Sequence, residues 1–130
     1  MPITGYNGKH VQIIVEKDQL TGANIRARQQ VTKLVRRIAD LIEDEAKRNV
    51  LFHDLYDTGN LLNSIHVYPT YPALYAEIIV GAYYGIYHEF GTVHLPVRAF
   101  LSPAIESIAP QFAEELARLM ESIFPERGIS

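Results

Sequence analysis

The chain has 130 residues, of which 48% are apolar and 21% charged, as in an ordinary folded domain and unlike a disordered, collagenous or membrane-spanning chain. Its net charge of -3 excludes a uniformly basic protein, and its lack of cysteine excludes disulfides and thiolate metal sites. No apolar run approaches the roughly 20 residues of a membrane helix and the first ten residues lack the pattern of a secretion signal, so we expect one domain over residues 1–130 without a membrane partner.

The first two elements differ in the period of their apolar residues. Residues 9–17 alternate, with Val11, Ile13 and Val15 on one side, which predicts a half-buried strand. From about Asn24 to Phe52 apolar residues recur every three or four positions, which predicts a long amphipathic helix. A strand followed by a long helix is therefore expected in the first half of the chain.

The long helix begins with a basic patch that contains no anion. Its members are Arg26, Arg28, Lys33, Arg36 and Arg37. One interpretation is a solvated helix face, and the other is contact with DNA phosphates or with an acidic partner. The sequence leaves both open.

The middle of the chain carries turn residues and then two extended segments. Asp57 or Thr58 is expected to cap a short helical turn over residues 61–64. Residues 65–68 look extended, and the two prolines of residues 69–72 connect them to an alternating segment at 74–80. An antiparallel hairpin is therefore expected.

Residues 83–106 are rich in aromatic, charged and proline residues. Residues 82–90 suit a short helix in which Tyr83, Tyr87 and Phe90 share one face, predicted to be buried against the sheet. Gly91 is expected to end that helix by adopting a left-handed conformation. Residues 92–97 then form a loop, which Pro96 keeps from being helical.

The segment after this loop predicts a second long helix. Ser102 is expected to cap its N-terminus before Pro103, and Pro110 is expected to bend the helix or to divide it in two. Glu89 and Arg98 flank the loop and are expected to pair across its base. These elements together predict an α+β domain, with a small antiparallel sheet packed against a long N-terminal and a long C-terminal helix.

No metal or catalytic site is evident in the sequence. His88, Glu89 and His94 do not match a zinc helix, because its histidines are four residues apart and these are six apart. The chain has no Gly-x-Ser-x-Gly motif and no glycine-rich phosphate loop. We therefore expect a protein without enzymatic activity, cofactor or metal, with a spatially assembled hydrolase as an open alternative.

Two motifs lie between residues 58 and 104. The upstream motif comprises Thr58, Gly59, Leu61, Ser64 and Ile65. The downstream motif comprises Tyr87, Glu89, Phe90, Gly91, Thr92, Pro96, Arg98, Phe100, Leu101, Pro103 and Ala104. Together they resemble the motifs of the tail-completion and head-tail joining proteins of tailed bacteriophages. The run from His88 to Gly91 also resembles the His-x-x-Gly motif of the related virion-morphogenesis proteins of contractile-tailed phages. The choice between the two groups stays open. Ala99 departs from the pattern, because both groups usually have proline there.

The resemblance implies a structural virion protein at the junction of head and tail, assembled in the cytoplasm of the bacterial host. It implies a ring, expected to be six-fold, that contacts the head connector or stopper proteins and the tail tube protein. DNA in transit through the ring is a further expected contact. The alternative function is a small nucleic-acid-binding domain that uses the helix over residues 24–37.

A closed ring needs one patch on each subunit to meet a different patch on the next. Our hypothesis places part of that interface in the loop after Gly91, since isolated apolar residues there are rimmed by polar ones. Its residues are Thr92, Val93, His94, Leu95 and Val97. A plain surface loop is the alternative interpretation.

Overall fold

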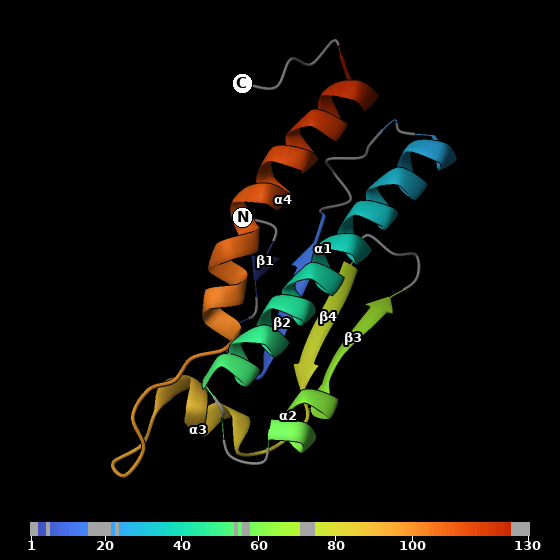
Figure 1. Ribbon diagram of the computed structural model, residues 1–130. Helices are drawn as coiled ribbons and strands as arrows, with labels where there is room; N and C mark the ends of the chain where they lie inside the picture. Colours follow the sequence, from blue (N-terminus) through green and yellow to red (C-terminus); the bar gives the residue numbers. More distant parts are fainter. Residues whose placement is uncertain are drawn as a thin grey trace.

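A computed structural model describes residues 3–4, 6–15, 22, 24–53, 55, 58–70 and 75–125. The elements are β1 (Ile3–Thr4), β2 (His10–Ile14), α1 (Ile25–His53), α2 (Thr58–Ser64), β3 (Ile65–Thr70), β4 (Tyr75–Val80), α3 (Gly85–Phe90) and α4 (Leu101–Ile123). Figure 1 shows the two long helices side by side, with the sheet behind α1 and the shorter helices gathered at one end. The predicted α+β architecture is confirmed.

The sheet is antiparallel, with strand order β1-β2-β4-β3. Val11 lies opposite Ile78, and Ile65 lies opposite Val80, so the apolar residues of neighbouring strands meet on the same inner face. The predicted hairpin of β3 and β4 is confirmed. The short strand β1 was not expected, because two residues are too few to show a period.

Strand β3 runs two residues further than expected and includes Pro69. This position is compatible with proline because β3 lies at the edge of the sheet, where one side of its backbone has no neighbouring strand to receive a hydrogen bond. Residues 69–72 were predicted only to connect the two strands, and this was wrong for Pro69 and Thr70, which belong to β3.

Helix α1 matches its predicted bounds to within one residue. The side chain of Asn24 caps its N-terminus, since Asn24 Oδ1 accepts a 2.8 Å hydrogen bond from the backbone N–H of Ala27. The apolar stripe is buried along the whole helix, with Val31, Ile38 and Ile42 fully inaccessible to solvent. Helix α1 packs against both α4 and the sheet, so it forms the centre of the core.

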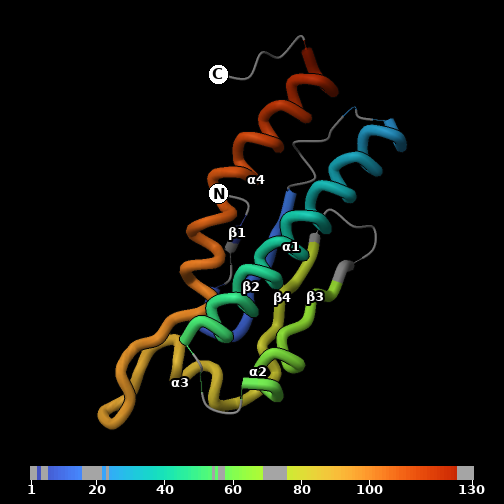
Figure 2. The backbone as a smooth tube through the Cα atoms, viewed as in Figure 1, coloured from blue at the N-terminus to red at the C-terminus, as the bar shows by residue number. Residues whose placement is uncertain are grey.

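Helix α4 is one continuous element through Pro110, so of the two predicted alternatives, a bend or a division into two helices, the division was wrong. Proline at this position removes the hydrogen bond to the carbonyl of Glu106. Both residues are exposed, and water can hydrogen-bond that carbonyl. The opposite face of α4, with Leu101, Ala104 and Phe112, is buried in the core. Figure 2 shows α4 running antiparallel to α1 along most of its length.

Helices α2 and α3 differ from their predicted starts. Helix α2 begins at Thr58, whose Oγ1 donates a hydrogen bond to the carbonyl of Leu55 and so does not cap the helix as an acceptor; Asp57 lies outside the described residues. Helix α3 begins at Gly85, three residues later than expected. A Cβ atom at Gly85 would lie 2.9 Å from Val80 Cγ1, so glycine permits the close contact of α3 with the sheet.

Among the described residues, no helix has the length and apolarity needed to cross a membrane.

Candidate interaction surface

The carboxylate of Glu89 is buried at the N-terminus of α4, with only 2% of the residue exposed. Its Oε1 accepts hydrogen bonds from the backbone N–H groups of Phe100 at 3.0 Å and Leu101 at 2.9 Å. Its Oε2 accepts a third from Ser102 at 2.8 Å. These N–H groups have no partner within the helix, and a negative charge there is favoured by the helix dipole. Glu89 is therefore the cap of α4, and the prediction that Ser102 caps it was wrong.

A fourth hydrogen bond to Glu89 comes from the N-terminal part of the chain. The hydroxyl of Tyr6 donates to Glu89 Oε2. Burial, and then the hydrogen bond with Glu89, raise the pKa of Tyr6 well above its ordinary value, so this hydroxyl stays protonated and remains a donor. The carboxylate thus joins α3, the start of α4 and the segment between β1 and β2.

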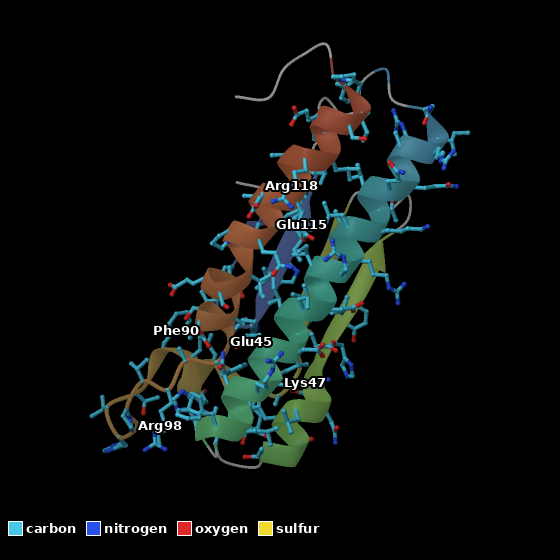
Figure 3. The ribbon with its side chains drawn as sticks, turned by 45° about the horizontal axis from the view of Figure 1, so that its top comes forward. Glu45, Lys47, Phe90, Arg98, Glu115 and Arg118 are labelled. Carbon is cyan, nitrogen blue, oxygen red and sulfur yellow. The ribbon has the colours of Figure 1, made fainter. Side chains whose placement is uncertain are left out.

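The predicted pair of Glu89 and Arg98 does not form. Both oxygens of Glu89 point to the start of α4, while Arg98 is exposed and has no ion pair among the described residues. The base of the loop is closed by the backbone instead, since the N–H of Arg98 donates to the carbonyl of His88 at 2.9 Å. Figure 3 shows Arg98 near Phe90 at the end of the molecule.

Residues 91–98, called here the finger, form an ordered loop. Gly91 has a φ of 75°, and a Cβ atom there would lie 3.0 Å from Val97 Cγ2 and 3.1 Å from the carbonyl oxygen of Leu95. Thr92 closes the tip, because its N–H donates to the carbonyl of Leu95 at 2.9 Å. Its hydroxyl oxygen also accepts from the N–H groups of His94 at 3.2 Å and Leu95 at 3.0 Å. Local hydrogen bonds therefore set the shape of the finger.

The finger and α3 expose apolar side chains to solvent. Val93 is 97% exposed at the tip of the finger, and Tyr83 is 78% exposed before α3. Tyr87 and Phe90 are also exposed, so the prediction that these three aromatics bury a shared face was wrong. The buried face of α3 carries Gly85, His88 and Glu89 instead. That face is turned inward because Gly85 packs closely against Val80 of β4 and because Glu89 accepts hydrogen bonds from the start of α4.

Exposed apolar side chains concentrate at this one end of the molecule. Ten large apolar side chains are exposed among the described residues, and eight of them lie at the C-terminal end of α1, at α3 or in the finger. We call these eight the apolar end: Leu51, Phe52, Tyr83, Tyr87, Phe90, Val93, Leu95 and Val97. Figure 1 shows that these segments lie next to one another. Apolar clusters of this kind mark surfaces that contact other molecules.

The two histidines of this region have different environments. His94 is exposed in the finger, and His88 is buried with its ring packed edge-on against Tyr84 at 6.3 Å between centroids. Burial, and then the charge of Arg98, lower the pKa of His88, which keeps its ring neutral. In the part of the chain that the structure describes, no three His, Asp or Glu side chains are placed to hold a metal ion.

The remaining motif residues are mostly structural. Leu61, Ile65, Phe100 and Leu101 are fully buried core residues. Ser64 belongs to a turn, since its hydroxyl donates to the carbonyl of Leu61 at 2.8 Å. Gly59, Pro96 and Pro103 are exposed. Most of the motif therefore shapes the region that carries the finger.

The basic patch does not form a single surface. All five of its cations are exposed. Lys33 and Arg37 line a groove between α1 and α4, and Arg26 lines a neighbouring hollow. Arg28 and Arg36 line neither. Arg37 forms a 2.9 Å ion pair with Glu115 of α4, which is the only ion pair made by these five cations among the described residues.

Comparison with known proteins identifies the class. Residues 13–91, more than half of the chain, match the model of a family described as "Bacteriophage HK97-gp10, putative tail-component". This match gives the class of the protein, a tail component of a bacteriophage. The chain belongs to the HK97-gp10-like family. No curated protein and no solved structure shows a significant match to it.

Proposed function

We propose that the protein forms a ring at the head-proximal end of a phage tail and joins the tail to the head connector. Membership of a family of tail components supports a structural role in the virion. The observation that carries the proposal of a ring is the apolar end, where three exposed apolar side chains of the ordered finger and five on neighbouring segments form one surface. Such a surface favours association with another protein.

The ordered finger makes this association favourable. Binding surfaces that are already ordered lose little conformational entropy on docking. Local hydrogen bonds of Thr92 and of the Gly91 N–H hold the finger, while Val93 and Leu95 remain open to solvent. The finger can therefore bury apolar area on the next subunit, which meets it with a different surface, as ring closure requires.

The proposed ring acts through its shape. Its expected copy number is six, and its expected neighbours are the head connector or stopper proteins and the tail tube protein. It would be assembled in the host cytoplasm and remain in the virion. This role needs no catalytic group and no cofactor. The alternative of a nucleic-acid-binding domain stays a prediction, and no surface described above favours it.

The proposal is tested by exchanging the apolar tip of the finger for charge. We expect Val93→Asp with Leu95→Asp to reduce or abolish ring formation, because two carboxylates would be buried without partners. Native mass spectrometry of the purified protein, alone and with the tail tube protein, measures the assembly. Ile25→Asp is the matched control, since Ile25 is exposed at the other end of α1. An assembly that survives the double substitution unchanged would contradict the proposal.

A further inference from the structure

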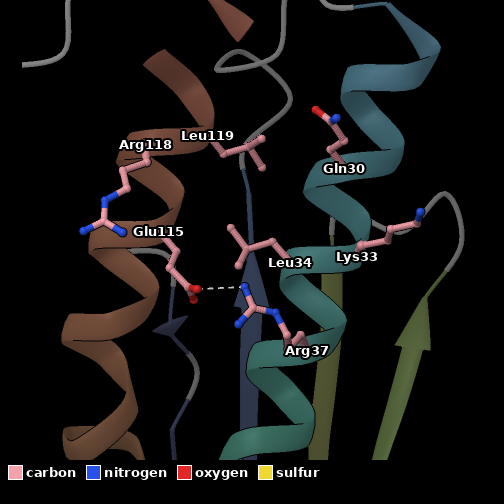
Figure 4. A pocket seen from close by; sticks show the side chains of 7 residues that line it. All are labelled: Gln30, Lys33, Leu34, Arg37, Glu115, Arg118 and Leu119. Atoms are coloured by element: carbon pink, nitrogen blue, oxygen red, sulfur yellow. Dashed lines mark hydrogen bonds and ion pairs between the residues drawn. The ribbon is translucent and has the colours of Figure 1, made fainter. Parts of the chain in front are cut away.

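The two long helices leave a groove between them, on the side away from the sheet. It lies between the N-terminal half of α1 and the C-terminal half of α4, far from the finger (Figure 4). Helix α1 contributes Lys33, Leu34 and Arg37, and α4 contributes Glu115, Arg118 and Leu119. The groove has a volume of about 510 Å³, which is large enough to receive several side chains of a docked segment.

The floor of the groove is apolar and its flanks are cationic. Leu34 and Leu119 point toward each other across the floor in Figure 4. In Figure 4 Lys33 extends from α1 and Arg118 from α4, each on the side away from the other helix, and Arg118 is paired with Glu114 one turn earlier. A second hollow continues the groove along the same helices, lined by Arg26 and Ile123 among others. An apolar floor with Arg26 and Lys33 on the α1 side and Arg118 on the α4 side is complementary to an amphipathic segment with acidic edges.

The groove also contains a buried acceptor. Glu115 Oε1 accepts from Arg37, but Glu115 Oε2 is buried and has no hydrogen-bond partner in the part of the chain described. A buried carboxylate oxygen is stabilised when a donor reaches it. A DNA backbone would bring phosphate oxygens, which only accept, next to this oxygen. A polypeptide can bring a donor together with its carboxylates, so the groove favours a protein over DNA.

We propose that this groove is a docking site for an acidic amphipathic helix of a partner protein. Apolar side chains of that helix pack on Leu34 and Leu119. Its carboxylates pair with Lys33 and Arg26 and replace Glu114 as the partner of Arg118, whose exposed pair with Glu114 is weak, and one of its donor side chains reaches Glu115. The docking site is separate from the apolar end and does not depend on ring formation.

The test measures binding of a designed peptide by fluorescence anisotropy. The probe is a fluorescein-labelled helical peptide with leucines along one face and with glutamates and serines along its edges. A matched peptide with lysine in place of each glutamate and a short duplex DNA are the comparison ligands. We expect the acidic peptide to bind and the lysine peptide to fail, with affinity that weakens as salt increases.

Charge reversal in the protein locates the site. Lys33→Glu with Arg118→Glu is expected to weaken binding of the acidic peptide by about tenfold or more. Arg28→Glu with Arg36→Glu changes the net charge equally, but these exposed residues lie outside the groove, so we expect a loss of less than about threefold.

Three outcomes would overturn the proposal. Equal losses for the two double variants would mean that only net charge attracts the peptide. Binding of duplex DNA without binding of the acidic peptide would assign the basic helix to nucleic acid. A change in the protein's own sedimentation caused by Lys33→Glu with Arg118→Glu would mean that a second copy covers the groove.

Discussion

At the scale of single residues, Glu89 determines how the finger is attached. Four donors from two segments, Tyr6 and the start of α4, converge on its carboxylate, which is buried there. The motif identified Glu89 as important, but not its partners. Backbone N–H groups are present at every residue except proline, so the sequence does not show which of them Glu89 binds, and Tyr6 is 83 positions away from Glu89. Chain folding brings these groups together, so sequence spacing predicted the wrong partner, Arg98.

The substitution Glu89→Gln is expected to destabilise the fold by about 2–3 kcal/mol. Glutamine removes the charge at the helix N-terminus. Its NH₂ group would also replace one of the two accepting oxygens and would then face hydrogen-bond donors instead of accepting from them. Urea unfolding followed by circular dichroism measures the change. Glu121→Gln, at an exposed position of α4, is the control and is expected to change the free energy of unfolding by less than about 0.5 kcal/mol. Equal effects of the two substitutions would contradict the role of Glu89.

Tyr6 gives a second prediction, which concerns alkaline pH. Its pKa is raised in the folded state, so its contribution to stability is fully present below the ordinary tyrosine pKa of 10.0 and is lost as pH rises above it. The stability difference between the wild type and Tyr6→Phe should therefore shrink from pH 9 to about pH 11. Urea titrations at a series of pH values measure it, and a constant difference would contradict the part-buried hydrogen bond to Glu89.

At the scale of elements, the spacing of apolar residues correctly predicted those helices and strands that bury the same face along their whole length. The stripe of α1 and the alternation in β2 and β4 were correct because each of these elements buries one face along its length. Helix α3 was wrong in its buried face, because six residues contain less than two turns and a single close contact decides the orientation. That contact depends on Gly85 meeting Val80, which is a tertiary feature.

The finger depends on glycine at position 91. Gly91→Ala is expected to cost about 1–3 kcal/mol, because the residue has positive φ and the new Cβ would press on the carbonyl oxygen of Leu95. Gly59→Ala is the matched control: Gly59 lies in α2 and a Cβ there meets no atom within 4 Å, so this change should be neutral or stabilising. Thermal unfolding of both variants measures the difference, and equal melting temperatures would be inconsistent with a strained Gly91.

At the scale of the whole molecule, two separate surfaces stand out. The apolar end lies around α3 and the finger, and the groove between α1 and α4 lies toward the opposite end of the long helices (Figures 1 and 4). The sequence located the finger and the cations. It did not show that Leu51 and Phe52 join the apolar end, or that the five cations divide between the groove and other surfaces. Both facts depend on how α1 lies beside α3 and α4.

The proposed role of the apolar end is to join subunits into a ring on the tail. The most direct measurement is negative-stain electron microscopy of tail tubes mixed with the wild-type protein or with the Val93→Asp and Leu95→Asp variant. We predict a ring at one end of the tubes with the wild type and bare tubes with the variant. Tubes that carry no ring with the wild-type protein, or rings that form equally well with the variant, would contradict the account.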